Sequence, residues 1–319
     1  MTPDRQLAVA VVGAGAFGRN HARVYHELHK RGEPVELAAI VDADSARAQA
    51  LAAQFGARAF RSVDEMLDTA QVDAASVAVP TIHHLEVAKI LLESGVDVLI
   101  EKPLASSLDE ADELIRAARN HQRIAQAGHL ERFNPAVRAT VPLVTQPMFF
   151  EVHRLSPFGP RALDVDVVLD LLVHDLDIAL DLVGKPVTEI RAVGVPILSE
   201  KIDIASVRLS FEGGCVANLT ASRVSQDKTR KFRFFQPDWY FSIDTQNRDV
   251  TAFRLDRLSG PPRIVPWPVT VEPADPLTAE DGAFLKACAE RSEPEVTGEA
   301  GRAALKLALD ILEEMRRGR

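Results

Sequence analysis

The sequence predicts an α/β protein with two domains: an N-terminal doubly wound parallel sheet, and a C-terminal α+β domain with an open, mainly antiparallel sheet. Three observations predict this fold. The apolar run LAVAVVG at residues 7–13 leads directly into glycines, as a parallel strand buried on both faces does. Strand and helix patterns then alternate as far as residue 125, which is typical of right-handed crossover units. After Phe149 apolar and polar residues alternate, which indicates antiparallel strands.

The elements of the first domain follow the opening strand in order. Helices are expected from the amphipathic segments, and the last of them starts with a Ser-x-x-Glu capping pattern at Ser107 and Glu110. We place the first domain at residues 1–125. The expected helices are 17–30, 45–55, 85–94 and 107–120, and the expected strands are 35–42, 72–80, 96–101 and 123–127.

The second domain, residues 126–319, combines one central helix with several period-two strands. A proline-rich, irregular stretch at 261–276 separates these strands from two closing helices. The expected helices are 164–183, 279–290 and 299–316, and the expected strands are 207–211, 216–224 and 232–243.

Composition limits the classes of function. With 319 residues, 46% of them hydrophobic, the chain is longer than one ordinary hydrophobic core organises, so two domains are expected. No apolar run is long enough to span a bilayer and the first residues do not resemble a signal peptide, so we expect a cytoplasmic protein with no membrane partner. The net charge of −9 disfavours nucleic acid as a partner. Cys215 and Cys288 show no spacing typical of disulfides or zinc, so we expect reduced core thiols and no metal.

A glycine-rich turn follows the first strand. Gly13-Ala14-Gly15-Ala16-Phe17-Gly18 fits the pattern G-x-G-x-x-G, in which Gly13 permits the tight turn, Gly15 admits a pyrophosphate and Gly18 allows close helix packing. The helix that begins here presents its N-terminal amides to phosphates. The pattern predicts a dinucleotide site that includes Ala16 and Phe17. An ordinary strand-to-helix turn and an FAD site are the alternatives.

Asp42 ends the second expected strand, 24 residues after Gly18. A carboxylate there accepts hydrogen bonds from the adenosine ribose hydroxyls and repels a 2′-phosphate. Asp42 therefore favours NAD over NADP, although Arg47 lies near enough in the sequence to keep NADP as an alternative.

Glu101-Lys102-Pro103 lies where a parallel strand ends, at the edge where open α/β sheets bind their ligands. Lys102 can donate a hydrogen bond to a substrate hydroxyl or carbonyl. The alternative is that Glu101 and Lys102 end the strand at the surface. An X-Pro bond also permits a cis peptide before Pro103.

Asp170 and His174 stand four residues apart in the expected central helix, so they share one face, and the carboxylate can orient the imidazole for proton transfer. The alternative is a solvated face, because these two residues belong to a longer polar stripe. The stripe consists of Asp166, Asp170, His174, Asp177 and Asp181.

Two further sets of residues are ambiguous. Pro80, Thr81 and His84 follow the third main strand and fit either the nicotinamide end of a groove or a helix start capped by Thr81. Arg154 and Arg223 fit either an anionic substrate or ion pairs at the surface. A basic cluster fits either a phosphate site or a solvated hairpin, and it contains Arg223, Lys228, Arg230, Lys231 and Arg233.

Taken in order, these motifs resemble the glucose-fructose oxidoreductase, inositol dehydrogenase and MocA (Gfo/Idh/MocA) family over nearly the whole chain. The resemblance implies a Rossmann domain followed by an α+β domain, and a catalytic set of Lys102, Asp170 and His174. His174 would accept the proton of a sugar hydroxyl and Lys102 would polarise its oxygen. Family members commonly associate through the open sheet, so a homodimer or homotetramer is implied. Leu172 departs from the family, which often has glycine there, and this puts the substrate size in doubt.

A narrower resemblance rests on residues 128–135, GHLERFNP, and on residues 222–244. These segments resemble UDP-N-acetylglucosamine 3-dehydrogenases, which implies oxidation of a sugar 3-hydroxyl and a diphosphate near Arg230. A dehydrogenase of a free polyol such as an inositol, a reductase of the biliverdin type and a non-catalytic NAD-sensing regulator are the alternatives.

Overall fold

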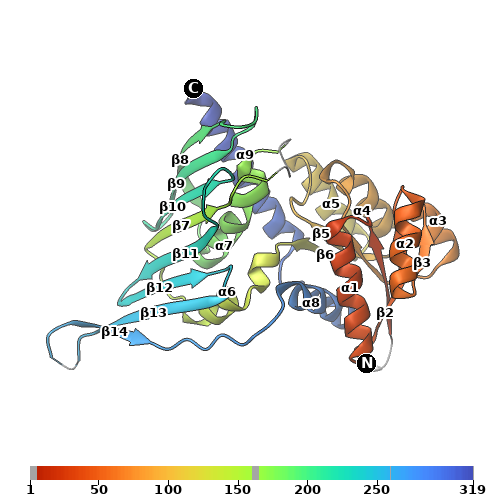
Figure 1. Ribbon diagram of the computed structural model, residues 1–319, viewed down its shortest axis with the longest axis horizontal. Helices are drawn as coiled ribbons and strands as arrows, with labels where there is room; N and C mark the ends of the chain where they lie inside the picture. The colour runs from red at the N-terminus through yellow and green to blue at the C-terminus, as the bar shows by residue number, and fades with distance from the viewer. Residues whose placement is uncertain (1–5, 160–164, 259, 319) are drawn as a thin grey trace. The chain divides into compact units, whose positions relative to one another are not determined.

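The computed structural model describes residues 6–159, 165–258 and 260–318 and divides into two compact units (Figure 1). The first unit extends to His129 and also includes Leu277–Arg302, while the second contains Leu130–Pro276 and the chain from Ala303. The domain boundary expected at residue 125 lies close to His129, where the first segment of the first unit ends. The sequence did not predict that a later segment, Leu277–Arg302, also belongs to that unit. The returning segment pairs with the edge of the parallel sheet, where the Ala127 amide donates to the Val296 carbonyl at 3.0 Å.

The first unit is built on a six-stranded parallel sheet in the order β3-β2-β1-β4-β5-β6. The order reverses between β1 and β4, and such a reversal opens a crevice at the carboxyl ends of the strands. All predicted strands of this sheet are present, and the three-residue β3 is too short to leave a periodic signal. The strands are β1 (Leu7–Val12), β2 (Val35–Val41), β3 (Arg58–Phe60), β4 (Ala74–Val77), β5 (Asp97–Glu101) and β6 (Ala125–Gly128).

Helices flank this sheet, and the four predicted for it are confirmed. The Ser107 hydroxyl accepts the Glu110 amide at 3.2 Å, which confirms the capping pattern. The short α3 was not expected. The helices are α1 (Ala16–Lys30), α2 (Ser45–Phe55), α3 (Val63–Thr69), the 3₁₀ turn η1 (Thr81–His83), α4 (His84–Glu93), α5 (Leu108–Asn120), α8 (Pro276–Glu290) and α9 (Gly298–Arg317).

The second unit contains an eight-stranded mixed sheet in the order β14-β13-β12-β11-β7-β10-β9-β8. Only β7 and β10 pair in parallel; all other neighbours are antiparallel, as predicted. The expected strand at 232–243 is a hairpin instead, because the chain turns at Asp238, whose φ of 61° ends the extended run. The strands are β7 (Phe149–Leu155), β8 (Val187–Val195), β9 (Ile204–Phe211), β10 (Val216–Ser222), β11 (Thr229–Gln236), β12 (Trp239–Asp244), β13 (Asp249–Asp256) and β14 (Arg263–Trp267).

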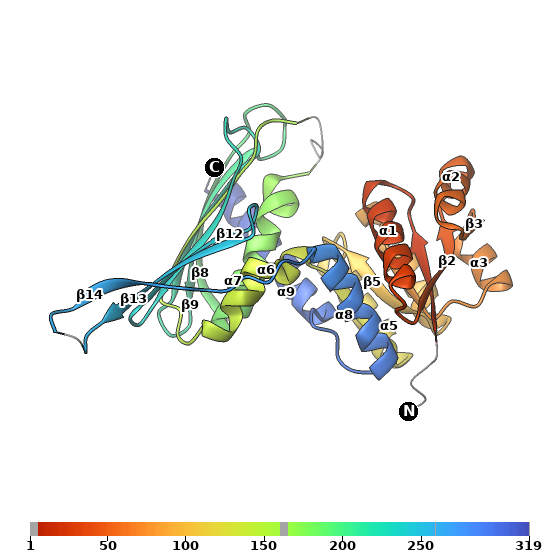
Figure 2. The same cartoon turned by 60° about the horizontal axis from the view of Figure 1, so that its bottom comes forward.

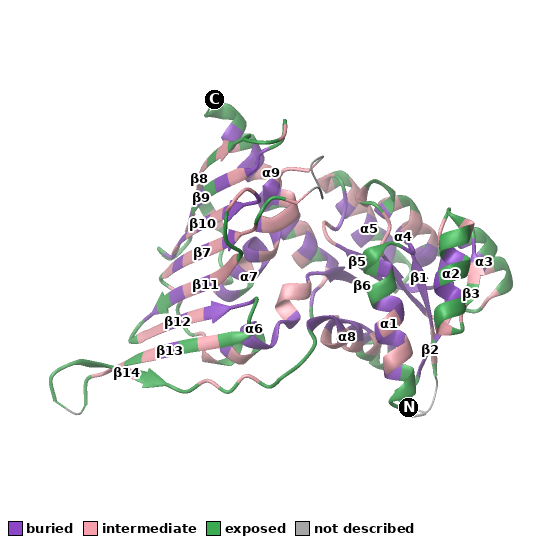
Figure 3. Ribbon diagram, in the orientation of Figure 1, coloured by how far each residue is buried: buried purple, intermediate pink, exposed green. Residues whose placement is uncertain are grey.

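One face of this sheet packs on helices and the other is open (Figure 2). The helical side holds α6 (Pro135–Thr140), a π-helical turn η4 (Val168–Leu172), α7 (Val173–Val183) and the second half of α9. Two short 3₁₀ turns, η2 (Leu130–Phe133) and η3 (Val141–Leu143), flank α6. Inward side chains such as Phe150, Phe232 and Phe234 form the core. Figure 3 shows buried positions along the strands of this sheet and on its helices. Residue 164, where the central helix was expected to start, lies outside the described residues.

Two predictions drawn from the composition can be compared with the structure: one concerns the cysteines and the other membrane-spanning helices. Cys215 and Cys288 are both buried free thiols, and burial raises the pKa of Cys215 to about 11. Among the helices in the described ranges, none is long and apolar enough to cross a membrane.

Candidate active site

The glycine-rich turn has the geometry that each glycine was expected to provide. Gly13 has a φ of 101°, and a Cβ there would lie 2.6 Å from the Ala78 carbonyl oxygen. A Cβ on Gly18 would lie 1.7 Å from the Gly13 oxygen, so α1 packs directly against the turn. A Cβ on Gly15 would meet no atom within 4 Å. The space above Gly15, at the start of a helix that no side chain caps, is where a pyrophosphate fits.

A cavity of about 730 Å³ extends from this turn along the carboxyl ends of β1, β2 and β4. Asp42 lies in its wall, and its two carboxylate oxygens accept the Ala14 amide at 2.7 Å and the Asp44 amide at 2.8 Å. The carboxylate is thus held beside the glycine turn. Six of the residues predicted to bind the cofactor line the cavity: Gly13, Gly15, Ala16, Phe17, Asp42 and Pro80.

Two arginines also line this cavity. Arg47 was noted from the sequence, and its guanidinium contacts the Asp44 carboxylate at 3.1 Å. Arg61 was not noted, because it follows β3, which left no signal in the sequence. The cavity wall therefore contains both the carboxylate that favours NAD and cations that attract phosphate.

His84, which was expected at the nicotinamide end of the groove, does not line this cavity. Its ring is 1% exposed, with Nε2 at 3.0 Å from the Val79 oxygen and Nδ1 at 3.1 Å from the Pro103 oxygen. Burial lowers the pKa of His84 despite these carbonyls, so the neutral ring donates one N–H. We therefore assign His84 to holding together the loops that follow β4 and β5. Thr81 opens η1 but its hydroxyl does not cap the turn, so the capping alternative is also wrong.

Glu101 is the last residue of β5 and is only 8% exposed, which excludes the alternative that it ends the strand at the surface. Its Oε1 lies 3.0 Å from Nε2 of His21, and its Oε2 accepts the Lys102 amide at 3.3 Å. Lys102 follows at the strand end, and the Lys102–Pro103 peptide is cis. The strand end that carries Lys102 is therefore anchored by a buried carboxylate.

The polar stripe of the central helix is partly exposed, but several of its carboxylates are paired. Arg132 donates to the buried Asp177 at 2.7 and 3.1 Å and lies 2.5 Å from Asp181, while Asp166 accepts the Ile202 amide at 2.8 Å. These three carboxylates have structural partners. The other two members of the stripe are also partly exposed: Asp170 lies in the π-helical turn η4 and His174 in the first turn of α7.

Leu172 lies between these two residues and is fully buried in the core of the second unit. Its side chain therefore occupies core volume and is not exposed to a substrate. The doubt about substrate size that Leu172 raised is not supported by this placement.

Next to this helix, Arg154 of β7 is buried and paired. Its Nε and Nη2 donate to Asp175 at 2.6 and 2.8 Å, and its Nη1 donates to Glu131 at 3.0 Å. Arg230 lies opposite Arg154 in the strand pairing, on the same face of the sheet. Its Nη1 is 3.5 Å from Glu131, and its buried Nε has no hydrogen-bond partner among the described residues. Burial and the nearby charge of Arg154 lower the pKa of Arg230.

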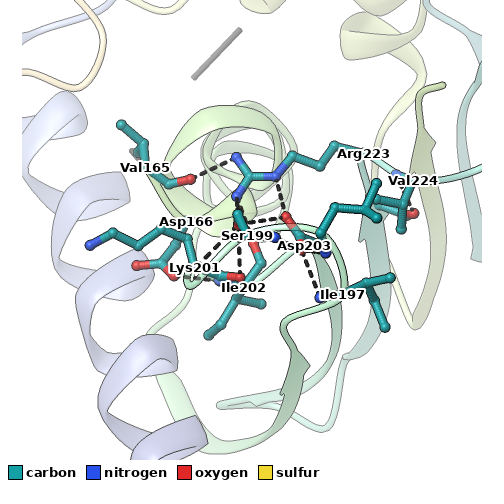
Figure 4. A network of polar contacts seen from close by, with 11 residues as sticks. Val165, Asp166, Ile197, Ser199, Lys201, Ile202, Asp203, Arg223 and Val224 are labelled. Carbon is teal, nitrogen blue, oxygen red and sulfur yellow. Dashed lines mark hydrogen bonds and ion pairs between the residues drawn. The ribbon is translucent and has the colours of Figure 1, made fainter. Parts of the chain in front are cut away.

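Arg223 is also a structural residue. Its Nε donates to Asp203 at 2.7 Å, its Nη1 donates to the Val165 oxygen at 2.7 Å, and its side chain also contacts Ser199 (Figure 4). The network ties the loop after β8 to the chain just before η4. Neither Arg154 nor Arg223 is a surface ion pair, and neither is available for an anionic substrate.

The basic cluster separates when the strand forms, because neighbouring side chains point to opposite faces. Lys231 pairs with Asp244 at 2.8 Å, and Arg233 lies 3.3 Å from Glu151. Lys228 is exposed in the preceding turn. Only Arg230 remains on the helical face near Asp170, whose charge acts on it.

Both units of the chain are similar to known proteins. A model of an oxidoreductase family with an NAD-binding Rossmann fold matches residues 7–129, and a GFO/IDH/MocA C-terminal domain model matches residues 145–237. The UDP-N-acetylglucosamine 3-dehydrogenase of Acidithiobacillus ferrooxidans is 37% identical over 308 residues, 96% of each chain. Its solved structure superposes with a TM-score of 0.89 over 97% of both chains.

More distant proteins share the fold. The inositol 2-dehydrogenase of Rubrobacter xylanophilus is 29% identical over 233 residues, which are 70% of this chain and 66% of that enzyme. A levoglucosan dehydrogenase solved with NADH and levoglucosan is 18% identical, with a TM-score of 0.84 over 98% of each chain.

Proposed function

Since the chain belongs to the Gfo/Idh/MocA oxidoreductase family, whose first domain is an NAD-binding Rossmann fold, we propose that it oxidises the 3-hydroxyl of UDP-N-acetylglucosamine to a ketone. The observation that carries the proposal is the match to the 3-dehydrogenase of Acidithiobacillus ferrooxidans, which extends over both units. The two family models include the glycine turn and Lys102, at residues 7–129, and Asp170 and His174, at residues 145–237.

The cofactor that fits the first unit is NAD. Gly15 leaves room for the pyrophosphate, and Asp42 is held by two amides in the position that suits a ribose diol. The carboxylate supports NAD over NADP, because it would repel a 2′-phosphate more directly than the partnered Arg47 would attract it. Bound NAD supplies the hydride acceptor, and the protein supplies orientation and proton transfer.

We assign the proton transfer to three side chains. Lys102 donates a hydrogen bond to the reacting oxygen, which stabilises the negative charge that develops there. His174 accepts the hydroxyl proton, and Asp170, one helical turn earlier, orients the imidazole. His174→Ala should lower kcat by roughly 10²- to 10⁴-fold and leave the Kd for NAD unchanged. Wild-type turnover in this variant would remove His174 from the mechanism.

Arg230 is the residue that we assign to the diphosphate of the substrate. Within the basic cluster, Arg223 on the helical side is already bonded to Asp203, whereas the Nε of Arg230 lacks a partner among the described residues. A hydrogen bond from a guanidinium to a charged oxygen contributes roughly 1.5–3 kcal/mol, or about 10- to 100-fold in affinity. Arg230→Met should therefore raise the KM for the UDP-sugar by that factor. Lys231→Met is the matched control, because Lys231 points to the other face and pairs with Asp244.

The open face of the large sheet supports a homodimer or homotetramer. A row of aromatic rings crosses this face: Phe149–Phe235, Phe235–Tyr240 and Tyr240–Phe253 have centroids 6.1, 4.9 and 6.1 Å apart. Phe235 is 40% exposed. Exposed aromatic rows of this kind are typical of protein interfaces. Light scattering of the purified protein measures the oligomer, and a monomer at micromolar concentration would contradict this part of the proposal.

The deciding experiment measures formation of reduced nicotinamide with NAD and a panel of UDP-sugars, free sugars and inositols. Turnover with UDP-N-acetylglucosamine, and none with N-acetylglucosamine, supports the proposal. Turnover with a free inositol alone would favour the second candidate, a polyol dehydrogenase, for which the inositol 2-dehydrogenase match is the observation. NAD binding with no turnover on any substrate would favour a regulatory protein.

A further inference from the structure

A buried cluster of four ionisable side chains lies at the strand end that carries Lys102. Three elements of the first unit contribute to it: α1 provides His21, β5 provides Glu101, and α8 provides Glu280 and Asp281. Glu101 is 8% exposed, and the other three are fully buried. Charged groups are costly to bury unless they have partners, so the arrangement of this cluster is informative.

The His21 ring bridges two carboxylates. Its Nδ1 lies 2.8 Å from Oδ1 of Asp281, and its Nε2 lies 3.0 Å from Oε1 of Glu101. A ring that donates to ionised carboxylates on both sides must carry two protons. Burial by itself would lower the pKa of His21, but the two carboxylates outweigh burial and raise that pKa well above its usual value. The ring is therefore an imidazolium at neutral pH.

Glu280 has a different state from its neighbours. Neither of its carboxyl oxygens has a hydrogen-bond partner among the described residues. Burial, together with the charge of Glu101, raises the pKa of Glu280 well above its usual value, so this group is a neutral acid. His21 is thus the one basic group of the cluster, and its two ring nitrogens face the carboxyl groups of Glu101 and Asp281.

Glu101 connects this cluster to Lys102. One carboxylate oxygen of Glu101 faces the His21 imidazolium, and the other accepts the backbone N–H of Lys102 at 3.3 Å. On β6, Gly128 leaves room for Glu101, because a Cβ there would lie 3.0 Å from the Glu101 Cα. Both ends of the carboxylate are thus held, and so is the peptide that leads into Lys102.

We propose that His21, held by Asp281, is a positioning residue for Lys102 and acts through Glu101. The ring joins α1, which starts at the glycine turn, to the end of β5, so the pyrophosphate site and the base of the lysine side chain keep a constant separation. Hydride transfer is sensitive to such distances, since a displacement of about 1 Å costs roughly 100-fold in rate. The proposal rests on the role of Lys102 given under the proposed function.

The test compares two substitutions of His21 that each keep one of its two contacts. The amide nitrogen of Gln reaches the place of Nε2 and can still donate to Glu101, whereas the amide of Asn matches Nδ1 and reaches only Asp281. We expect His21→Asn to lower kcat by roughly 10- to 100-fold, with the Kd for NAD changed less than threefold, and His21→Gln to retain most of the activity. Asp281→Asn, which removes the charge and keeps an acceptor, should fall between them.

Tyr25→Phe is the matched control, since Tyr25 lies one turn later in α1, is fully buried and bonds Ser76 at 2.6 Å and not Glu101. It should lower Tm without lowering kcat. If His21→Gln and His21→Asn lose equal activity, or lose it only in proportion to Tm as Tyr25→Phe does, then His21 is merely structural and the proposal is overturned.

A second measurement does not depend on turnover. In protein with ¹⁵N-labelled histidine, the resonances absent from His21→Gln identify the His21 ring. Glu101 and Asp281 face its nitrogens, and the neutral Glu280 and Tyr25 are the other ionisable groups near it. We expect both nitrogens to stay protonated through the pH range in which an ordinary imidazole loses its proton. A His21 ring that titrates near its usual pKa would contradict the proposed bridge between Asp281 and Glu101. If instead the bridge is intact but Lys102→Met keeps full activity, the role assigned to Lys102 is wrong, and not the bridge.

Discussion

Arg154→Met tests how the second unit tolerates buried charge. The substitution keeps the length and apolar volume of the side chain but removes the guanidinium from between Asp175 and Glu131. Arg154 is 1% exposed and Asp175 is 2% exposed, so water cannot replace the lost partner without opening the core.

The magnitude follows from the asymmetry of buried ion pairs. Burial raises the pKa of Asp175, whereas the charges of Asp175 and Glu131 raise the pKa of Arg154, so desolvation and attraction oppose each other in this pair. The intact pair therefore contributes little net stability, but removal of one partner leaves a buried charge and costs about 3–5 kcal/mol. Replacing both partners by apolar residues of similar volume is often neutral. We expect Arg154→Met to lose about 3–5 kcal/mol and Arg154→Met/Asp175→Leu to regain most of it.

Urea unfolding followed by circular dichroism measures the free energy of unfolding of the three proteins, and the Tm provides a second readout. In Arg154→Met the unpaired carboxylate is that of Asp175, which a proton can neutralise in acid. The difference in stability between the wild type and this variant should therefore be smaller at low pH. The reasoning is refuted if the single variant stays within about 1 kcal/mol of the wild type, or if the double variant is no more stable than the single one.

Three further predictions concern the glycine turn, the ribose site and the network of Figure 4. Gly15→Ala should leave Tm unchanged but weaken NAD binding at least tenfold, because its Cβ meets no protein atom yet occupies the space for the pyrophosphate. Gly18→Ala should lower both Tm and the affinity for NAD, since its Cβ would clash with the Gly13 oxygen. Thermal melts measure Tm, and calorimetric titration measures the affinity. Asp42→Ala should raise the Kd for NAD about tenfold and shift the preference toward NADP, and an unchanged Kd would mean that another residue holds the ribose. Burial opposes ionisation of Asp203, but three backbone amides and Arg223 outweigh it and hold the pKa of Asp203 well below its usual value. Its contribution to stability is therefore present above about pH 4 and lost as the pH falls, so the Tm difference between wild type and Asp203→Asn should be large at pH 7 and shrink in acid.

Some features of this protein were determined by short stretches of sequence. The glycine turn and the Ser107 cap depend on residues within a few positions of each other, so the pattern in the chain already contains the geometry. The position of Asp42 is a further such feature. Strand β2 pairs in parallel with β1, so Asp42 at the end of β2 lies beside the glycine turn that follows β1. The glycine turn, Asp42 and Pro80 in the cavity wall were accordingly predictable, whereas the residues that follow the unexpected β3, such as Arg61, were not.

The partners of the charged residues were decided only by tertiary structure. His21 and Asp281 are 260 positions apart, and Arg132 is 45 positions from Asp177, yet each pair forms a hydrogen bond that involves a buried carboxylate. A polar stripe with helical spacing looks the same in sequence whether water or an arginine faces it, so the stripe that ends in Asp181 was ambiguous. Burial removes that ambiguity, because a charge without water requires a partner within hydrogen-bond distance. Which residues supply those partners depends on how distant elements pack, and local periodicity contains no record of it.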